Sequence, residues 1–467
     1  MILCENQAYY TGWTKNISER FQKHKNGNGS RYTKLNRPIK VVYWKTCKDK
    51  SFAMRTEIGI KKLTRKQKER LIFGWREEMN LPEEFDQYEY LSIAPGRVNI
   101  LGEHIDYNGG SVLPAAIDRY VFLGANKRTD QMIKITALDL KDTITFRINN
   151  IEKKIDIHGN PLPDWALYPA GVFWAAKKQN LELSGFEGIF ASSIPMGAGL
   201  SSSAAVEVAF AALMREFCSW DMDNMELAKM CQYAENQYIG VNCGLMDQFA
   251  SANGIKNAFL FFNTTNLDWY PVEIPDTISI VITNSKIPRS LATSAYNDRR
   301  VSCEQALRKF QNKFPDIQNL CELSLSEFEE VQKSVDDTLQ KRSKHVVEEC
   351  ARVNQAIDLL KDNQLNEFGN LMKASHNSLR DLYEVSTPEL DDLVSIASGL
   401  QGCYGSRLTG AGFGGCIVSL VEKKAVSAFV SALASSYRAK TGKEIETYVC
   451  TASDGVTVQW CEKNSSK

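Results

Sequence analysis

The sequence predicts an α+β protein built from more than one module, and three observations support this prediction. From Tyr90 onward, short β-like stretches alternate with longer stretches of helical periodicity. A glycine- and serine-rich bend stands directly before an alanine-rich run at residues 197–206. The charge is uneven: residues 1–78 hold 19 Lys and Arg against seven Asp and Glu, whereas the rest hold 37 against 49. The mixed order of strands and helices argues against a parallel Rossmann sheet.

The composition sets broad limits. A chain of 467 residues is long enough for two or three domains, and 43% hydrophobic and 24% charged residues are usual for a globular protein. No run approaches the ~18 apolar residues of a membrane span, and the start lacks the regions of a signal peptide, so we expect a cytoplasmic protein without a membrane partner. The twelve cysteines contain no Cys-x-x-Cys pair, which favours reduced, buried thiols over a zinc site or a disulfide framework.

The basic segment 1–78 reads as a separate small α/β module. Ala8 to Thr14 predicts a strand and a turn, and a helix follows from Ile17 or Ser18. Residues 40–44 predict a second strand, and residues 51–63 a second helix. The acidic, Pro82-containing stretch 79–89 is then the predicted linker.

The remaining sequence predicts two domains, at 90–275 and 276–467. Strands are expected at 120–126, 132–137, 143–148, 186–190, 258–262, 279–283, 415–421 and 446–450. Helices are expected at 169–179, 202–218, 225–238, 298–313, 324–361, 365–382 and 424–441.

The segment before the predicted helix 202–218 has the chemistry of a phosphate cradle. Glycines let the backbone curl without a Cβ penalty, and the following helix presents unpaired N–H groups and the positive end of its dipole. The alternative is a serine-rich helix N-cap. The candidate phosphate-binding residues are Gly197, Ala198, Gly199, Leu200, Ser201, Ser202 and Ser203.

Two further motifs accompany this cradle, at residues 94–110 (APGRVNILGEHIDYNGG) and 406–416 (SRLTGAGFGGC). Together the three resemble the motif set of the GHMP small-molecule kinases, and the first resembles the galactokinase signature. The resemblance extends through residues 242–249, 375–386 and 388–391. It implies a GHMP kinase fold with an N-terminal ribosomal-protein-S5-like domain and a C-terminal ferredoxin-like domain. It also implies ATP-dependent phosphorylation of D-galactose at the anomeric hydroxyl.

The resemblance implies a role for each site residue. Ser203 and Glu235 would hold Mg²⁺. Asp247, expected in a glycine-bounded loop, would accept the proton of the sugar hydroxyl, and Arg97 would pair with it. The turn 410–415 would support the phosphate site. The implied sugar-binding residues are Glu103, His104, Ile105, Asp106, Asp247 and Tyr296.

Two other functions remain open at this point. An N-acetylgalactosamine kinase shares most of these motifs and would need a larger pocket for the acetamido group. A non-catalytic galactose sensor is the other alternative, but such relatives lack two residues within the serine motif, which is complete here at residues 201–205. We expect a monomer or a weak homodimer.

Residues 1–78 resemble a GIY-YIG endonuclease domain. Tyr10 stands in the second tyrosine motif, Arg20 at the helix arginine and Glu57 at the metal-binding glutamate. Where the family has its first tyrosine motif, this sequence has only Met1-Ile2-Leu3. The resemblance therefore predicts an incomplete module without nuclease activity, and nucleic-acid binding by residues 1–78 is the less favoured alternative.

Overall fold

The computed structural model describes residues 1–15, 17–41, 43, 50–65, 67–68, 81–195, 197–287 and 292–460. These form two compact units. One comprises Met1–Leu91, Leu123–Asn126 and Val458–Lys467, and the other comprises Ser92–Phe122 and Lys127–Thr457.

The first unit contains a three-stranded antiparallel sheet in the order β2-β1-β3. The strand β1 is therefore central, although it is only three residues long. The helix α2 begins after Ser30, whose side chain accepts a hydrogen bond from the Thr33 N–H. The predicted linker contains a short helix, η1, whose Phe85 is buried. The elements are β1 (Ile2–Cys4), β2 (Tyr9–Tyr10), α1 (Ile17–Lys25), α2 (Arg31–Leu35), β3 (Pro38–Val41), α3 (Lys50–Lys62) and η1 (Glu83–Gln87).

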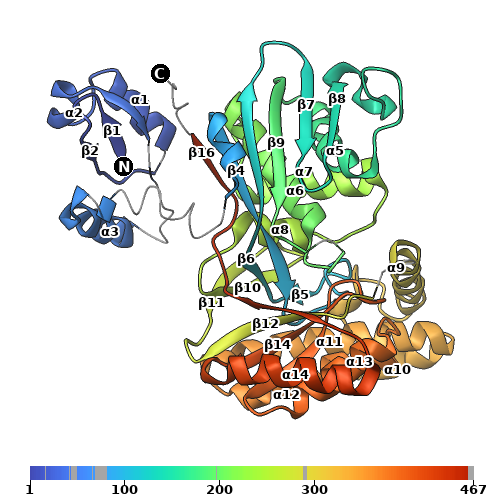
Figure 1. The fold of residues 1–467 in the computed structure, drawn as a ribbon. Coiled ribbons are helices and arrows are strands. Elements are labelled where there is room, and N and C mark those ends of the chain that lie inside the picture. Colours follow the sequence, from blue (N-terminus) through green and yellow to red (C-terminus); the bar gives the residue numbers. More distant parts are fainter. Residues whose placement is uncertain are drawn as a thin grey trace. The chain divides into compact units, whose positions relative to one another are not determined.

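The N-terminal half of the second unit is built on a mixed sheet in which β4, β6, β9, β7 and β8 follow one another (Figure 1). β7 pairs antiparallel with β8 and parallel with β9. The strands are β4 (Tyr90–Asn99), β6 (Pro114–Lys127), β7 (Met132–Ala137), β8 (Asp142–Arg147) and β9 (Phe186–Ser192). The helices are η2 (Ile148–Lys153), α5 (Asp164–Lys178), α6 (Ser202–Cys218), α7 (Asn224–Ala234), η3 (Glu235–Ile239) and α8 (Met246–Asn253).

The C-terminal half has a four-stranded antiparallel sheet in the order β13-β14-β12-β15, and a small sheet β11-β10-β5 accompanies it. The strands of these two sheets are β5 (Ser111–Val112), β10 (Ala258–Asn263), β11 (Trp269–Glu273), β12 (Ile278–Asn284), β13 (Cys403–Thr409), β14 (Cys416–Glu422) and β15 (Glu446–Cys450). The last strand, β16 (Thr457–Trp460), lies mostly in the first unit. The helices are α9 (Ala292–Phe310), η4 (Leu320–Glu322), α10 (Leu325–Val331), η5 (Gln332–Ser334), α11 (Asp337–Lys361), α12 (Leu365–Asp381), α13 (Pro388–Gly399), η6 (Lys423–Ala425) and α14 (Val426–Thr441).

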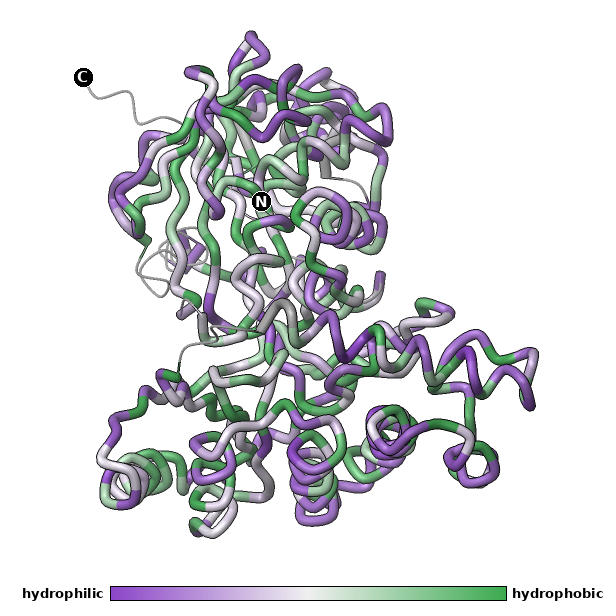
Figure 2. Tube along the Cα trace, turned by 90° about the vertical axis from the view of Figure 1, so that its right-hand side faces the viewer, coloured by the Kyte–Doolittle hydropathy of each residue, from purple (hydrophilic) through white to green (hydrophobic). Residues whose placement is uncertain are grey.

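The helices α12, α13 and α14 pack against the strands β13 and β14. Figure 1 shows these helices on one side of the sheet. In Figure 2 the helices at the bottom of the view carry both hydrophilic and hydrophobic residues, as expected for helices that bury one face.

Most predicted elements are present, and the differences have physical reasons. The predicted helix 202–218 coincides with α6. The predicted start at Pro169 is wrong because α5 begins at Asp164. Proline lacks the N–H that a helix interior uses, yet contacts of Trp165 with Asp142 and Phe190 accompany the extra turn. The predicted loop around Asp247 is also wrong, because Asp247 lies in the first turn of α8.

Candidate active site

The glycine–serine segment forms a tight loop that opens onto the N-terminus of α6. Gly197, Gly199 and Ser201 all have positive φ, of 68°, 77° and 56°. Ser201 is the N-cap residue of α6, but its side chain does not cap the helix. Its hydroxyl instead donates a hydrogen bond of 2.5 Å to Asp247 Oδ2. The first N–H groups of a 17-residue helix are therefore left without a side-chain cap, which suits an anion.

Arg97 connects this loop to Asp247. The guanidinium lies on β4, is buried, and reaches Asp247 Oδ1 through Nε at 2.8 Å and Nη2 at 2.7 Å. Its Nη1 donates to the Gly199 carbonyl at 2.8 Å. The predicted Arg97–Asp247 pair is present. The Asp247 carboxylate is thus oriented by two donors, the Arg97 guanidinium at Oδ1 and the Ser201 hydroxyl at Oδ2.

The segment around Glu103 is anchored to the C-terminal half of the same unit. Glu103 forms a buried ion pair with Arg407 at 2.5 Å. Burial raises the pKa of the Glu103 carboxyl, while Arg407 and Arg97 oppose this shift. The side chain of Ile105 is completely buried, and its carbonyl accepts hydrogen bonds from the N–H groups of Asn108 and Gly110.

His104 is held by both ring nitrogens. Nε2 lies 3.2 Å from the Ala411 carbonyl, which can only accept, so Nε2 carries the proton. Nδ1 then accepts from the Tyr107 hydroxyl at 2.8 Å, and this hydroxyl contacts that of Tyr383 at 2.9 Å. Burial lowers the pKa of His104 to about 3, so the ring is neutral near pH 7. The ring of Tyr296 packs on His104 with centroids 5.4 Å apart.

Asp106 lies beside the start of α8. The Met246 N–H donates to its carboxylate. A Cβ added at Gly244 would lie 2.0 Å from Asp106 Oδ2, so only glycine permits this approach. Burial, and then the charges of Asp247 and Glu103, raise the pKa of Asp106 to about 7. The predicted sugar residue Asp106 and the predicted base Asp247 are therefore neighbours.

Ser203 and Glu235 also come together. The Ser203 hydroxyl hydrogen-bonds the Glu235 carboxylate, which is buried on the π-helical turn η3. Burial and the charge of Asp247 raise the pKa of Glu235 to about 7. Among the described residues no group of three or more His, Cys, Asp and Glu side chains could hold a metal. One hydroxyl and one carboxylate nevertheless fit Mg²⁺, which keeps several waters and phosphate oxygens as ligands.

Two further polar residues accompany Glu235 that the sequence analysis missed. Gln248 Nε2 donates to Glu235 Oε2 at 2.5 Å and to Glu207 Oε2 at 3.1 Å. Glu207 lies on α6 and is completely buried. Burial, and then the charge of Glu235, raise the pKa of Glu207 well above its usual value. The signal in the sequence was a single acid within an otherwise alanine- and valine-rich helix face.

The turn 410–415 contacts the sugar segment in the structure. The Gly410 N–H hydrogen-bonds Glu103, and the Ala411 carbonyl binds His104. A Cβ at Gly412 would lie 2.3 Å from the Val385 carbonyl, so the turn packs closely on the chain that follows α12. The contacts described here support the sugar side of the site, whereas the sequence analysis assigned the turn to the phosphate side.

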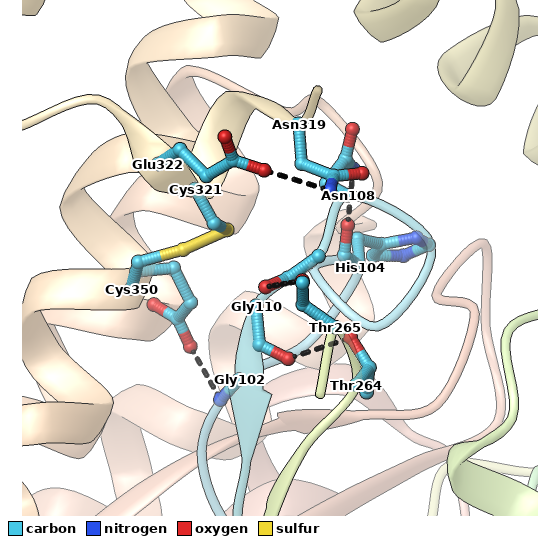
Figure 3. The surroundings of a disulfide bond; sticks show 12 residues. Gly102, His104, Asn108, Gly110, Thr264, Thr265, Asn319, Cys321, Glu322 and Cys350 are labelled. Atoms are coloured by element: carbon cyan, nitrogen blue, oxygen red, sulfur yellow. Dashed lines mark hydrogen bonds between the residues drawn. A yellow bond between two sulfur atoms is a disulfide. The ribbon is translucent and has the colours of Figure 1, made fainter. Parts of the chain in front are cut away.

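One expectation about the cysteines is wrong. Cys321 and Cys350 form a disulfide between η4 and α11, with Cα atoms 6.0 Å apart. Figure 3 shows this bond beside the loop that carries Gly102, His104 and Asn108, and the Cys321 N–H donates to the Asn108 carbonyl. The two residues are 29 apart in sequence, so tertiary packing rather than a local motif brings them together.

The three nuclease-like residues are all in the first unit. Tyr10 stacks on Tyr32 with ring centroids 6.2 Å apart. Glu57 Oε2 accepts from the Trp13 N–H at 3.0 Å, and Glu57 Oε1 pairs with Lys61. Arg20 is exposed. Both carboxylate oxygens of Glu57 are thus engaged within the module.

Four family models match the chain, and three of them describe one class of small-molecule kinase. GHMP kinases N terminal domain matches residues 168–254, and GHMP kinases C terminal matches 356–439. The galactokinase galactose-binding signature matches residues 82–127. The GIY-YIG catalytic domain matches residues 1–70.

Individual relatives narrow this class. A galactokinase of Roseiflexus sp. is 44% identical over 78% of this chain and 91% of its own length. The Bacillus subtilis galactokinase is 39% identical over 78% and 92%. The crystal structure of Lactococcus lactis galactokinase complexed with galactose has a TM-score of 0.75 at 35% identity, covering 82% of this chain and 98% of that one. The chain belongs to the galactokinase family.

Within the parts that the structure describes, no helix is long and apolar enough to cross a membrane.

Replacing Gly244 by alanine should weaken galactose binding. The new methyl group would meet Asp106 Oδ2 at 2.0 Å and displace this carboxylate from the site. We expect KM for galactose to rise about tenfold or more, as for the loss of a charged hydrogen-bond partner. Gly399→Ala is the control, because nothing lies within 4 Å of a Cβ there. A Gly244→Ala chain with unchanged KM would contradict the placement of Asp106.

The Asp106→Asn variant should show a pH-dependent gain in stability. Because the pKa of Asp106 is about 7 in the folded state and 3.8 for an ordinary aspartate, the folded state binds the extra proton and loses stability as pH rises from about 4 to 7. Asparagine removes this loss. We expect the Tm of the variant to exceed that of the wild type by a few degrees at pH 8 and by less at pH 5. Equal differences at both pH values would contradict the raised pKa.

Proposed function

We propose that this chain transfers the γ-phosphoryl group of ATP to the anomeric hydroxyl of D-galactose, giving α-D-galactose 1-phosphate and ADP. One observation carries the proposal: Asp247 is held by Arg97 and Ser201 between the glycine–serine loop and the sugar segment. A hydroxyl placed there meets a carboxylate on one side and a phosphate cradle on the other. This arrangement suits phosphoryl transfer, in which positioning and charge stabilisation dominate.

Asp247 and Asp106 have different functions in the proposed reaction. Asp247 orients the anomeric hydroxyl and accepts its proton as the new bond to phosphorus forms. Arg97 faces both Asp247 and the loop, so its charge can stabilise the transferring group. Asp106 accepts hydrogen bonds from sugar hydroxyls, and the neutral His104 and the Tyr296 ring form one wall of the sugar site.

Ser203 and Glu235 are the residues that would hold Mg²⁺. When bound, this ion neutralises the charge of the triphosphate. Ser203 lies in the first turn of α6, so the same segment carries the cradle and a metal-binding hydroxyl. A positive ion would also favour the ionised form of Glu235.

The product identifies the reaction. Purified chain, galactose and MgATP should yield one equivalent of ADP for each sugar phosphate, and ³¹P NMR should place the phosphate on the α-anomeric carbon. Phosphate on another carbon would refute the proposed position of transfer. Hydrolysis of ATP without a sugar phosphate would refute the kinase activity itself.

The basic N-terminal module should be dispensable for this reaction. Every proposed site residue lies in the unit Ser92–Phe122 and Lys127–Thr457. A chain that begins at Asn80 should therefore phosphorylate galactose with kcat within about twofold of the full chain. Loss of most activity in the shortened chain would contradict this independence.

The same module should not cut DNA. We expect the full chain to leave branched and single-stranded DNA intact with Mg²⁺ present, because both carboxylate oxygens of Glu57 are engaged within the module by the Trp13 N–H and Lys61. Cleavage that is abolished by Glu57→Ala would overturn this prediction.

A further inference from the structure

We propose that Glu207, acting through Gln248, positions the carboxylate of Glu235 at the metal site and is a positioning residue for phosphoryl transfer. The inference deepens the proposed function and rests on its metal site. Glu207 lies in α6, Glu235 in η3 and Gln248 in α8. The helix α6 follows the phosphate cradle, η3 carries the proposed metal ligand, and α8 also carries Asp247.

The hydrogen bonds of Gln248 set the geometry. Its single amide nitrogen has two N–H groups, and they are directed to Glu235 Oε2 at 2.5 Å and Glu207 Oε2 at 3.1 Å. Because both protons are used, the amide plane is fixed by the two carboxylates together. Gln248 directly follows Asp247 in the first turn of α8. The position of Glu235 is thereby coupled to the helix that carries Asp247.

The burial of Glu207 lowers the stability of the fold. Its exposure is 0%, and the first-turn neighbours Ala204 and Ala205 are also completely buried. None of the ion pairs described for the chain includes Glu207, and its Oε1 has no hydrogen-bond partner among the described residues. A buried carboxyl group with one oxygen left without a hydrogen-bond partner costs free energy in either protonation state. Stability therefore does not explain Glu207, whereas the orientation of Gln248 does.

The Cys243 thiol is the other group that contacts Glu235 Oε2. Cys243 Sγ lies 3.4 Å from Glu235 Oε2, but a thiol is a weak donor. The Gln248 amide is thus the strong donor on that oxygen. If Gln248 rotated, Glu235 Oε2 would lose the 2.5 Å hydrogen bond from this amide, and Glu235 would keep only its contacts with Cys243 and Ser203. Groups that orient a metal ligand in this way typically change metal affinity by about 10- to 100-fold when removed.

The decisive variant is Glu207→Gln, which keeps the shape and replaces the carboxyl group by an amide. Its new amide can donate to Gln248 Oε1, which has no partner among the described side chains, and so reverse the Gln248 amide. We expect Mn²⁺ binding in the presence of a non-hydrolysable ATP analogue, followed by electron paramagnetic resonance, to weaken about tenfold. The apparent Mg²⁺ constant of the reaction should rise to a similar extent. Galactose affinity without nucleotide and the Tm should not fall.

The controls separate positioning from structure. Glu216→Gln removes an exposed carboxylate from the same helix and should bind Mn²⁺ as the wild type does. Gln248→Met removes both hydrogen bonds and should weaken Mn²⁺ binding, which provides the same test if the Glu207 variant is too unstable to purify. Because Glu207 acts through Gln248, the double variant should bind no more weakly than Gln248→Met alone.

The outcomes are distinct. Mn²⁺ binding by Glu207→Gln equal to that of the wild type would overturn the proposed role of Glu207, whichever sugar the chain uses. Additive effects in the double variant would overturn the route through Gln248. A wild-type chain that binds Mn²⁺ and nucleotide but does not phosphorylate galactose would count against the proposed function and leave the Mn²⁺ comparison to decide the role of Glu207.

Discussion

Replacing Asp247 by asparagine is expected to lower kcat by at least about a thousandfold, because both proton acceptance and the charge near the transferring group are lost. Asparagine has nearly the same shape, so Arg97 and Ser201 stay in place. Galactose and ATP should therefore bind with Kd values within about twofold of the wild type, since only the transition-state interaction is removed. Single-turnover kinetics measures the loss in the rate of phosphoryl transfer, and equilibrium binding measures the Kd values for galactose and ATP.

The control for this variant is Asp221→Asn, which neutralises an exposed carboxylate in the same unit. It should leave kcat unchanged. Near-normal turnover by Asp247→Asn would remove Asp247 from the catalytic role. A large loss of galactose binding would instead make it a sugar-binding residue.

The second large effect is expected at the metal site. Ser203→Ala and Glu235→Gln each remove one oxygen donor from a pair that hydrogen-bonds in the structure. We expect the Mg²⁺ concentration for half-maximal rate to rise about 10- to 100-fold in each variant. Galactose affinity measured without nucleotide should change by less than about twofold.

Titration of Mg²⁺ at saturating galactose and ATP provides the measurement. Ser436→Ala is the control for the loss of a hydroxyl, because it removes an exposed hydroxyl from α14 and leaves both proposed metal donors and the cradle intact. An unchanged Mg²⁺ requirement together with weaker galactose binding would show that Ser203 and Glu235 serve the sugar rather than the metal.

The sequence could locate the site where its residues lie in short segments. The cradle, the sugar segment and the stretch around Asp247 each carry several site residues within a few positions. The start of α6 was also predictable, because glycines and serines directly precede an alanine-rich run. The position of a residue within such a segment does not predict where its side chain points. Ile105 lies among the predicted sugar-binding residues, but its side chain is buried in the core.

The supporting contacts could not be predicted because they join distant parts of the chain. The Arg407–Glu103 ion pair spans 304 positions, and the Gln248–Glu207 hydrogen bond spans 41. Neither pair has a local pattern. The Cys321–Cys350 disulfide was missed for the same reason. The helical start of α8 was missed because flanking glycines favour a loop, whereas packing of α8 on α6 and α7 overrides that local preference.

A comparison of sugars tests the central claim most directly. The full chain should be assayed with MgATP against galactose, N-acetylgalactosamine, glucose and arabinose under the same conditions. We predict the highest kcat/KM for galactose, with measurable turnover that Asp247→Asn abolishes. A higher kcat/KM for N-acetylgalactosamine, or binding of galactose and ATP without any turnover, would contradict the proposal that the chain is a galactose-1-kinase.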